Sequence, residues 1–255
     1  MLPLISKNLI SQIRLLHHKK HRDEQQFFMV EGVKSCMETL QSDFEVVHTF
    51  ATSCFAVDEV NISDIQLISE KEMERISCLT TAPEILCIVK KTQYNLNDLD
   101  NEKPLLALDA IRDPGNLGTI IRTADWFGFT QILCSEDCVE FTNPKVIQAT
   151  MGSFTRIKMV YANLLEYLKT QNNRVIYGLD MNGAPIQKQT YKHNDIIIVG
   201  SESHGISEKV AEYISTKIEI PIFPHAGAAP ESLNAAMAAG IFMYESRRQR
   251  LDYLL

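Results

Sequence analysis

Short apolar runs alternate with segments of helical spacing through the C-terminal part of the chain, and this pattern constrains the fold most. The runs lie at residues 105–111, 131–134, 174–179, 196–200 and 217–220. Strands separated by helices in this way form a parallel sheet with both faces covered. We therefore expect an α/β fold with a mostly parallel sheet, closed by an alanine-rich helix that opens at Ser232 and continues to Arg250.

The first ninety residues predict a small α/β domain of a different kind. Helical spacing appears at 6–20, 31–41 and 70–77, and β-rich runs at 46–50, 65–68 and 85–89. Polar, Asn- and Asp-rich residues then lead to Pro104 without an apolar period. The predicted organisation is a domain over 1–92, a linker over 93–104 and a second domain over 105–255.

Charge and cysteine content limit the protein classes that fit. A net charge of −7 argues against a protein that coats nucleic acid, although Arg14, Lys19, Lys20 and Arg22 form a local basic cluster. A solvated helix face is the plain interpretation of such a cluster taken alone. The six cysteines form no CxxC pair, which favours reduced thiols in the cytoplasm over disulfides or zinc.

The N-terminus predicts neither a signal peptide nor a membrane span. Lys7 and Arg14 interrupt its apolar residues, and no run in the chain approaches the ~18 apolar residues that a spanning helix needs. A cytoplasmic protein without membrane partners is the expectation.

A glycine-containing loop follows the first apolar run of the second domain. Its sequence, DPGNLGTIIR, places Asn116 six residues before Arg122, and we expect a turn followed by a helix that begins near Leu117. An ordinary turn explains these residues if they are taken alone. Because GxxxxGK[ST] and GxGxxG motifs are absent from the sequence, ATP and dinucleotide sites lose support.

Two further loops carry polar residues after predicted strands. Glu202 follows the run at 196–200, where a carboxylate could cap a helix or orient another group. Ser232 and Asn234 precede the alanine-rich helix, and Ser232 is the expected N-cap. Each loop alone has a structural explanation, but three in this order do not.

The three loops together resemble the SpoU/TrmH family of RNA ribose methyltransferases, within the SPOUT superfamily. The matching segments are DPGNLGTIIRTADWFGF, IIIVGSESHGIS and IPIFPHAGAAPESLNAAMAAGIFMYE, with support from PKVIQATMGS at 144–153. The N-terminal half resembles the family's ribosomal-protein-like substrate-binding domain. One difference is the loop between Ile220 and Ser232, which is longer than is usual and contains His225, to which we assign no role.

The resemblance implies a deep trefoil knot in the C-terminal domain, with S-adenosylmethionine bound by loops that follow Leu179, Gly200 and Ile220 and closed by Leu233. It also implies methylation of an RNA ribose 2′-hydroxyl without a metal ion. A protonated guanidinium is a poor base, so electrostatic stabilisation is the role expected of Arg122. The other matching residues, which would position ribose, phosphate and Arg122, are Asn116, Glu202, Ser232 and Asn234.

The resemblance further implies a homodimer in which the C-terminal helix is a main contact, and it gives the N-terminal basic cluster an RNA-binding role. Large-subunit ribosomal RNA is the favoured substrate because of the added N-terminal domain, with transfer RNA as the alternative. The alternative functions are a non-catalytic RNA-binding protein of this fold, a nucleotide-binding oxidoreductase, and a base-nitrogen methyltransferase. The sequence favours the ribose methyltransferase over each of them.

Overall fold

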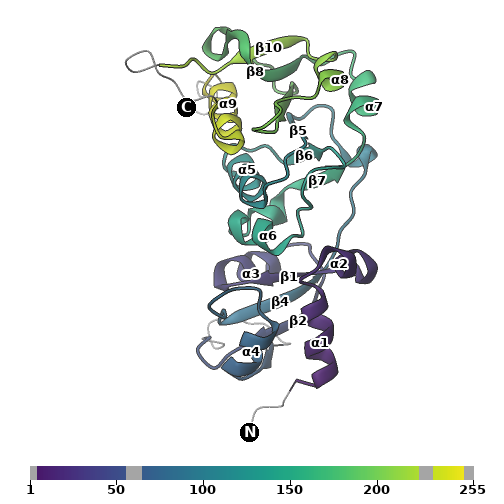
Figure 1. Cartoon of the computed structure of the whole chain (residues 1–255), viewed down its shortest axis with the longest axis vertical. Coiled ribbons are helices and arrows are strands. Elements are labelled where there is room, and N and C mark those ends of the chain that lie inside the picture. The colour runs from purple at the N-terminus through teal and green to yellow at the C-terminus, as the bar shows by residue number, and fades with distance from the viewer. Residues whose placement is uncertain (1–4, 56–64, 224–231, 250–255) are drawn as a thin grey trace. The chain divides into compact units, whose positions relative to one another are not determined.

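A computed structural model describes residues 5–55, 65–223 and 232–249 (Figure 1). Contacts between residues divide the chain into two units. The N-terminal unit contains Met1–Thr92 together with Glu140–Thr155, and the C-terminal unit contains Gln93–Val139 and Arg156–Leu255. The segment at 140–155 therefore packs with the N-terminal unit, although the sequence pattern grouped it with the second domain.

The N-terminal unit is built on a four-stranded sheet in the order β1-β4-β2-β3. Strand β4 pairs antiparallel with β1 and β2, and β3 pairs parallel with β2. The elements are α1 (Lys7–Leu15), α2 (Lys19–Gln25), β1 (Phe27–Glu31), α3 (Val33–Leu40), β2 (Val46–Ala51), β3 (Ile65–Leu67), α4 (Glu70–Ile76) and β4 (Ile85–Lys90).

Two sequence-based expectations for this unit were wrong. The helix expected over 6–20 is two helices, α1 and α2, because the chain breaks after Leu15. Arg22 stabilises this break by donating to the carbonyl oxygens of Leu16 (2.8 Å) and His17 (2.9 Å). Strand β1 was missed, because four of its five residues are buried and it therefore lacks the alternation of a half-buried strand.

Aromatic packing holds residues 140–155 within the N-terminal unit. Phe28 makes edge-to-face contacts with Phe141 and Phe154, at ring-centroid distances of 6.0 and 5.9 Å. Buried aromatic pairs of this geometry add stability beyond their burial. The segment contains α6 (Pro144–Thr150) and leads into the 3-10 helix η3 (Ser153–Arg156).

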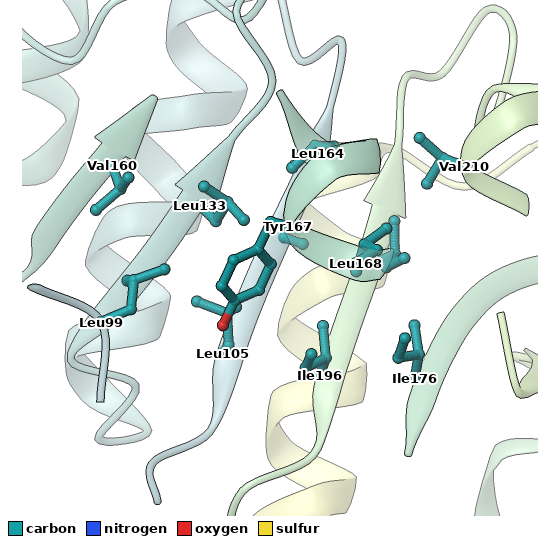
Figure 2. Close-up of a cluster of buried hydrophobic side chains, with 12 residues drawn as sticks. Leu99, Leu105, Leu133, Val160, Leu164, Tyr167, Leu168, Ile176, Ile196 and Val210 are labelled. Carbon is teal, nitrogen blue, oxygen red and sulfur yellow. The ribbon is translucent and has the colours of Figure 1, made fainter. Parts of the chain in front are cut away.

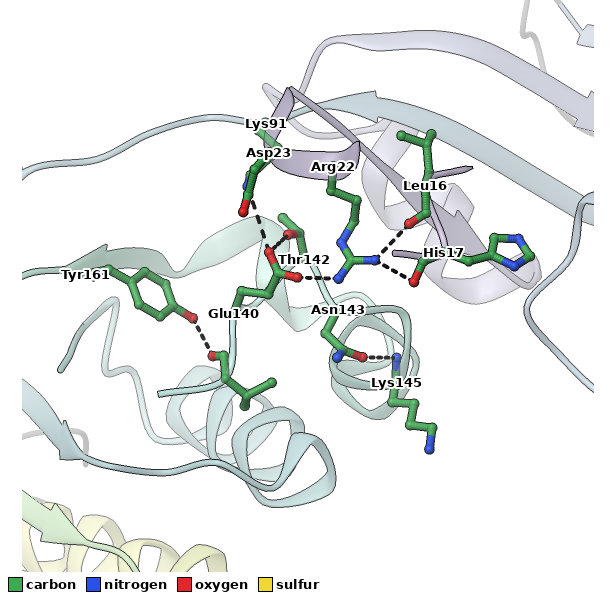
Figure 3. A network of polar contacts seen from close by, with 11 residues as sticks. Leu16, His17, Arg22, Asp23, Lys91, Glu140, Thr142, Asn143, Lys145 and Tyr161 are labelled. Atoms are coloured by element: carbon green, nitrogen blue, oxygen red, sulfur yellow. Dashed lines mark hydrogen bonds and ion pairs between the residues drawn. The ribbon is translucent and has the colours of Figure 1, made fainter. Parts of the chain in front are cut away.

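A buried ion pair reinforces this packing. The Arg22 guanidinium donates to Glu140, whose second carboxylate oxygen accepts from the Thr142 hydroxyl at 3.1 Å and lies 3.9 Å from Lys91 (Figure 3). Because Arg22 is 2% exposed, its charge is stabilised by the protein rather than by water.

The C-terminal unit is built on a wholly parallel six-stranded sheet in the order β10-β8-β9-β5-β6-β7, which confirms the predicted α/β fold class. Its strands are β5 (Leu105–Asp109), β6 (Gln131–Cys134), β7 (Lys158–Tyr161), β8 (Ile176–Pro185), β9 (Ile196–Gly200) and β10 (Thr216–Glu219). Its helices are η2 (Leu96–Asp98), α5 (Pro114–Trp126), α7 (Leu164–Lys169), η4 (Ile186–Lys188), α8 (Glu208–Ala211) and α9 (Ala235–Arg248).

Helices cover both faces of this sheet. Leu164, Tyr167 and Leu168 of α7 pack on side chains from the central strands, including Leu105 and Ile196 (Figure 2). Helix α9 lies behind the sheet in the same view and packs against α5 and β9. Burial on both faces explains why the strands appear in the sequence as continuous apolar runs.

The predicted linker is an ordered part of the C-terminal unit. Leu99 is buried with the sheet core, and the side-chain amide of Gln131 exchanges two 2.9 Å hydrogen bonds with the backbone of Asp100. Arg174 donates to the Lys103 carbonyl oxygen at 2.9 Å. Within the described ranges, no helix has the length and apolar character needed to cross a membrane.

Candidate active site at the carboxyl edge of the parallel sheet

Helix α5 begins at the carboxyl end of β5, one residue after Asp113. The Asp113 side chain is the N-cap and accepts from the Asn116 backbone N–H at 2.8 Å, with Pro114 at the first helical position. The helix expected near Leu117 therefore starts three residues earlier. Asp113 and Pro114, which suggested a turn, are also residues that favour the start of a helix. Asn116 consequently lies in the first turn.

Three polar side chains from separate segments meet at this edge. Asn116 Nδ2 donates to Glu202 Oε1 at 3.2 Å, and Asn234 Nδ2 lies within donor distance of both Glu202 Oε1 and Asn116 Oδ1, at 2.5 and 2.8 Å. Glu202 Oε1 also accepts from the Ala235 backbone N–H at 3.1 Å. We call Asn116, Glu202 and Asn234 the amide–carboxylate trio.

Asn234 has a second role, as the N-cap of α9. Its Oδ1 accepts from the backbone N–H groups of Ala236 (3.0 Å) and Met237 (3.2 Å). The expectation that Ser232 caps this helix was wrong. The helix begins at Ala235, so the residue in the N-cap position is Asn234. Ser232 is exposed, and no hydrogen bond of its side chain is found among the described residues.

Glu202 lies in a tight turn. Ser201 and Gly205 exchange backbone hydrogen bonds of 3.1 and 2.8 Å, which close the turn directly after β9. A Cβ atom on Gly200 would lie 2.1 Å from the carbonyl carbon of Gly205, so this close approach requires glycine.

The pairing of β8 with β10 is irregular in the stretch where the resemblance predicts the cofactor. Between the β10 pairs Lys217↔Gly178 and Ile218↔Ala184, residues 179–183 of β8 have no partner in β10. A Cβ on Gly183 would lie 2.4 Å from the Ile218 backbone, so two segments approach closely here. Such backbone fits a ligand held by main-chain groups.

The predicted cofactor-contacting residues are placed around these segments. Leu179 and Ile220 are half-buried beside the irregular pairing, Gly200 ends β9, and Leu233 is 45% exposed just before α9. Most of the loop after Ile220, including His225, lies outside the described residues.

A pocket of about 600 Å³ is lined in part by Asn116 and Glu202 of the trio. It extends over the carboxyl ends of β9, β5 and β6, and we call it the edge pocket. Ser135 and Arg112 donate to Asp137 at its rim and hold the pKa of that carboxyl below its ordinary value. Its polar lining includes Asp109, Arg112, Asp113, Asn116, Asp137 and Glu202.

Arg122 does not join the trio within one chain. It is exposed on α5, and six residues of helix place it roughly 120° around the axis from Asn116. The described residues offer it no ion pair or hydrogen bond. It shares an exposed helix face with Thr119 and Trp126 instead.

The residues of the predicted RNA-binding cluster differ in exposure within the N-terminal unit. Arg14, Lys19 and Lys20 are exposed on α1 and α2. Arg22 is buried and bound to Glu140, so its expected contact with RNA phosphate is corrected to a structural role.

Asp109 was not singled out from the sequence. It ends β5, is 6% exposed, and accepts from the Ser207 backbone N–H at 2.7 Å. The available signal was a carboxylate at the end of an apolar strand, the edge where parallel sheets bind ligands.

Comparisons with known proteins cover both halves of the chain. Residues 103–244 match the SpoU rRNA Methylase family, and residues 7–87 match an MRM3-like substrate binding domain. The chain is 30% identical over 242 residues to the 23S rRNA (guanosine(2553)-2′-O)-methyltransferase RlmP of Bacillus subtilis (strain 168), covering 91% of this chain and 93% of that protein.

Solved structures agree with this assignment. A putative RNA methyltransferase of the TrmH family from Porphyromonas gingivalis is similar with a TM-score of 0.86 and 30% identity, over 97% of this chain and 100% of that one. An AdoMet-bound rRNA methyltransferase from Sinorhizobium meliloti has a TM-score of 0.85 and 27% identity, over 97% and 98%. The resemblance seen in the three sequence motifs is confirmed, and the chain belongs to the SpoU rRNA Methylase family.

Proposed function

We propose that this protein transfers a methyl group from S-adenosylmethionine to a ribose 2′-hydroxyl of large-subunit ribosomal RNA. The observation that carries the proposal is the trio, in which motif residues from three separated segments meet at the sheet edge. The names of similar proteins specify 23S rRNA and 2′-O-methylation, and one similar structure holds AdoMet. Transfer RNA is the alternative substrate.

The protein's task in this reaction is alignment and charge stabilisation. S-adenosylmethionine, when bound, supplies a methyl group already activated by its sulfonium. Asn116 and Asn234 hold Glu202 in one orientation, which fixes the turn after β9, one of the proposed cofactor loops and part of the lining of the edge pocket. A guanidinium placed beside the ribose oxygen stabilises the negative charge that develops as the 2′-hydroxyl loses its proton, and Arg122 is the proposed source.

We propose a homodimer that supplies this guanidinium across its interface. Support comes from the exposed stripe Thr119, Arg122 and Trp126 on α5, which adjoins α9, where Met237 and Tyr244 are 56% and 51% exposed. Exposed apolar side chains on two packed helices are typical of an association surface. The partner's Arg122 would then complete the site.

The dimer is tested by sedimentation together with fluorescence, because Trp126 is the chain's one tryptophan and is 84% exposed. Association is expected to shift its emission to shorter wavelength as the protein concentration rises. A monomer at working concentration with unshifted emission would contradict the proposal.

The remaining parts of the proposal follow the family resemblance. Arg14, Lys19 and Lys20 form an exposed basic surface for RNA phosphates, the chain acts in the cytoplasm, and the C-terminal unit closes into a deep trefoil knot. A crystal structure with bound S-adenosylmethionine that traces residues 221–234 would test the knot directly, since its chain path either threads a loop or does not.

The activity test is transfer of radiolabelled methyl from S-adenosylmethionine to unmodified ribosomal and transfer RNA. Wild type should yield a labelled 2′-O-methyl ribose, and Arg122→Ala should lower the rate about 100- to 1,000-fold. Arg75→Ala, which changes an exposed helix arginine of the N-terminal unit, should retain the rate. Cofactor binding without label in either RNA would favour the non-catalytic RNA-binding protein.

A further inference from the structure

Ala110 has an unusual backbone conformation close to the trio. It lies between the end of β5 and the start of α5, and it lines the edge pocket together with Asn116 and Glu202. Its φ of +57° is in the left-handed region, where a residue other than glycine is disfavoured by roughly 5- to 30-fold in population. Such strain persists only where surrounding contacts compensate for it, and it is frequent at active sites.

The turn after β6 provides contacts of this kind. We call residues 135–138 the β6 turn, because a 3.1 Å backbone hydrogen bond from the Cys138 N–H to the Ser135 carbonyl oxygen closes it. The Ala110 backbone N–H donates to Ser135 Oγ at 2.9 Å, and the Ile111 N–H donates to Cys138 Sγ at 3.2 Å. Ile111 and Cys138 are 2% and 8% exposed, so water does not compete for the second bond.

Asp137 completes the arrangement. Its Oδ1 accepts from the Ser135 hydroxyl at 2.6 Å, which leaves a lone pair of Oγ for the Ala110 N–H. Its Oδ2 accepts from Arg112 at 2.9 Å. Three consecutive residues of the loop before α5 are therefore each bound by a side chain of the β6 turn.

The position of this loop sets where α5 begins. Only Asp113 separates Arg112 from Pro114, the first residue of the helix, and Asn116 lies in the first turn. The bond from Asn116 to Glu202 is 3.2 Å long, near the upper end of the useful range, so a small shift of the helix start would break it. Contacts that fix the loop therefore also fix Asn116 in the trio.

We propose that Ser135 and Cys138 are positioning residues for methyl transfer, which hold Ala110 in its left-handed conformation and thereby keep Asn116 in the trio. This inference rests on the proposed function of the trio. The β6 turn lies outside the three sequence motifs, and it acts on the reaction through α5 rather than by contact with the substrate.

The test compares two variants that remove the same kind of hydrogen bond. Ser135→Ala removes the acceptor of the Ala110 N–H, and Ser42→Ala, in the N-terminal unit, removes a serine oxygen that accepts from the Phe44 N–H at 3.2 Å. Methyl transfer to unmodified large-subunit ribosomal RNA gives kcat, and titration gives the affinity for S-adenosylmethionine. Ser135→Ala should lower kcat about 5- to 30-fold and leave the cofactor affinity within about 2-fold, and Ser42→Ala should retain both.

Glycine at position 110 distinguishes positioning from a general loss of stability. Because glycine adopts positive φ without a steric penalty, Ala110→Gly should raise the kcat of Ser135→Ala at least about 3-fold and change that of wild type by less than about 2-fold. Gln26→Gly is the matched control, since Gln26 also has a positive φ, of +59°, but lies at the end of α2. Added to Ser135→Ala, it should restore no activity.

Cys138 is tested by a pair of variants. Cys138→Ala leaves the Ile111 N–H buried without its acceptor and should lower kcat about 5- to 30-fold. Cys138→Ser keeps an acceptor at this position and should retain at least about one third of the wild-type kcat. The unfolding temperature reports whether each variant is folded, and the Cys138 pair decides the question if Ser135→Ala does not fold.

Several results would overturn the inference while leaving the proposed function intact. They are a wild-type kcat in folded Ser135→Ala, an equal loss in Ser42→Ala, or equal rescue by Gln26→Gly and Ala110→Gly. Equal losses in the two Cys138 variants would likewise exclude a role for its hydrogen bond. Absence of any methyl transfer by wild type would instead reject the proposed function.

Discussion

Arg22 and Arg122 were both predicted to act on RNA, and the regions around them differ in what holds the side chain. Around Arg22, helices α1 and α2 and the segment at 140–155 enclose the guanidinium, which is bound by two carbonyl oxygens and a carboxylate. Around Arg122, the α5 surface leaves the guanidinium exposed. An arginine whose donors are used by its own chain stabilises the fold, whereas an exposed one can serve a ligand or a second subunit.

The largest expected effect that would sharpen this comparison is the loss of folding stability when Arg22 is replaced. Arg22→Met should lower the free energy of unfolding by about 3 kcal/mol or more, because it leaves the Glu140 carboxylate in the interior without its main partner. Urea unfolding measures the change. Adding Glu140→Gln to Arg22→Met should restore part of the loss, and a double variant no more stable than the single one would contradict the ion-pair explanation.

A substitution at Asn234 can distinguish its hydrogen bonds within the trio from its role as the N-cap of α9. Asn234→Ser keeps an oxygen that caps α9 but removes the Nδ2 donor to Glu202 and Asn116, so methyl transfer should fall about 10- to 100-fold while stability changes by less than about 1 kcal/mol. Asn163→Ser changes the N-cap of α7 in the same way and should retain activity. Equal activity losses in the two variants would assign Asn234 a capping role alone.

Charge reversal at Arg14, Lys19 and Lys20 tests the exposed part of the basic cluster. The triple change to Glu should weaken RNA binding about 10-fold or more at low salt and reduce the salt dependence of the affinity, because phosphate contacts release counterions. S-adenosylmethionine affinity should stay constant. RNA affinity equal to that of wild type across a salt titration would remove the N-terminal unit from the proposed RNA surface.

The smallest expected effect concerns a buried carboxylate of the N-terminal unit. Burial raises the pKa of Glu31 above its ordinary value, although hydrogen bonds from Ser77 and Cys78 oppose the shift. The folded state then binds the proton more readily than the unfolded state, so this group's contribution to stability rises as pH falls from neutral toward the ordinary glutamate pKa. Wild type should gain stability relative to Glu31→Gln as the pH falls from 7 to 5, measured by urea unfolding at each pH. A stability difference that is constant with pH would contradict this linkage.

Sequence patterns predicted the C-terminal sheet well and the N-terminal unit less well, for a physical reason. Strands buried on both faces appear as compact apolar runs, so β5, β6 and β9 were found close to their observed bounds. The same property hid β1, which follows directly on α2 without a turn signal. Capping was also misassigned, since Ser232 and Asn234 are both good N-cap residues and only backbone geometry selects between them.

The sequence by itself determined the α/β class of the C-terminal unit, the family, and the residues that form the trio, because motif spacing and apolar periodicity are local properties of the chain. Only the tertiary structure decided which polar groups are already satisfied. It assigned Arg22 to Glu140, placed Arg122 on an exposed face of α5, joined residues 140–155 to the N-terminal unit and paired Asp109 with the Ser207 backbone N–H. These outcomes depend on contacts between residues far apart in the chain. Motif spacing and periodicity describe only neighbouring residues, so they do not specify which distant group a charged side chain contacts.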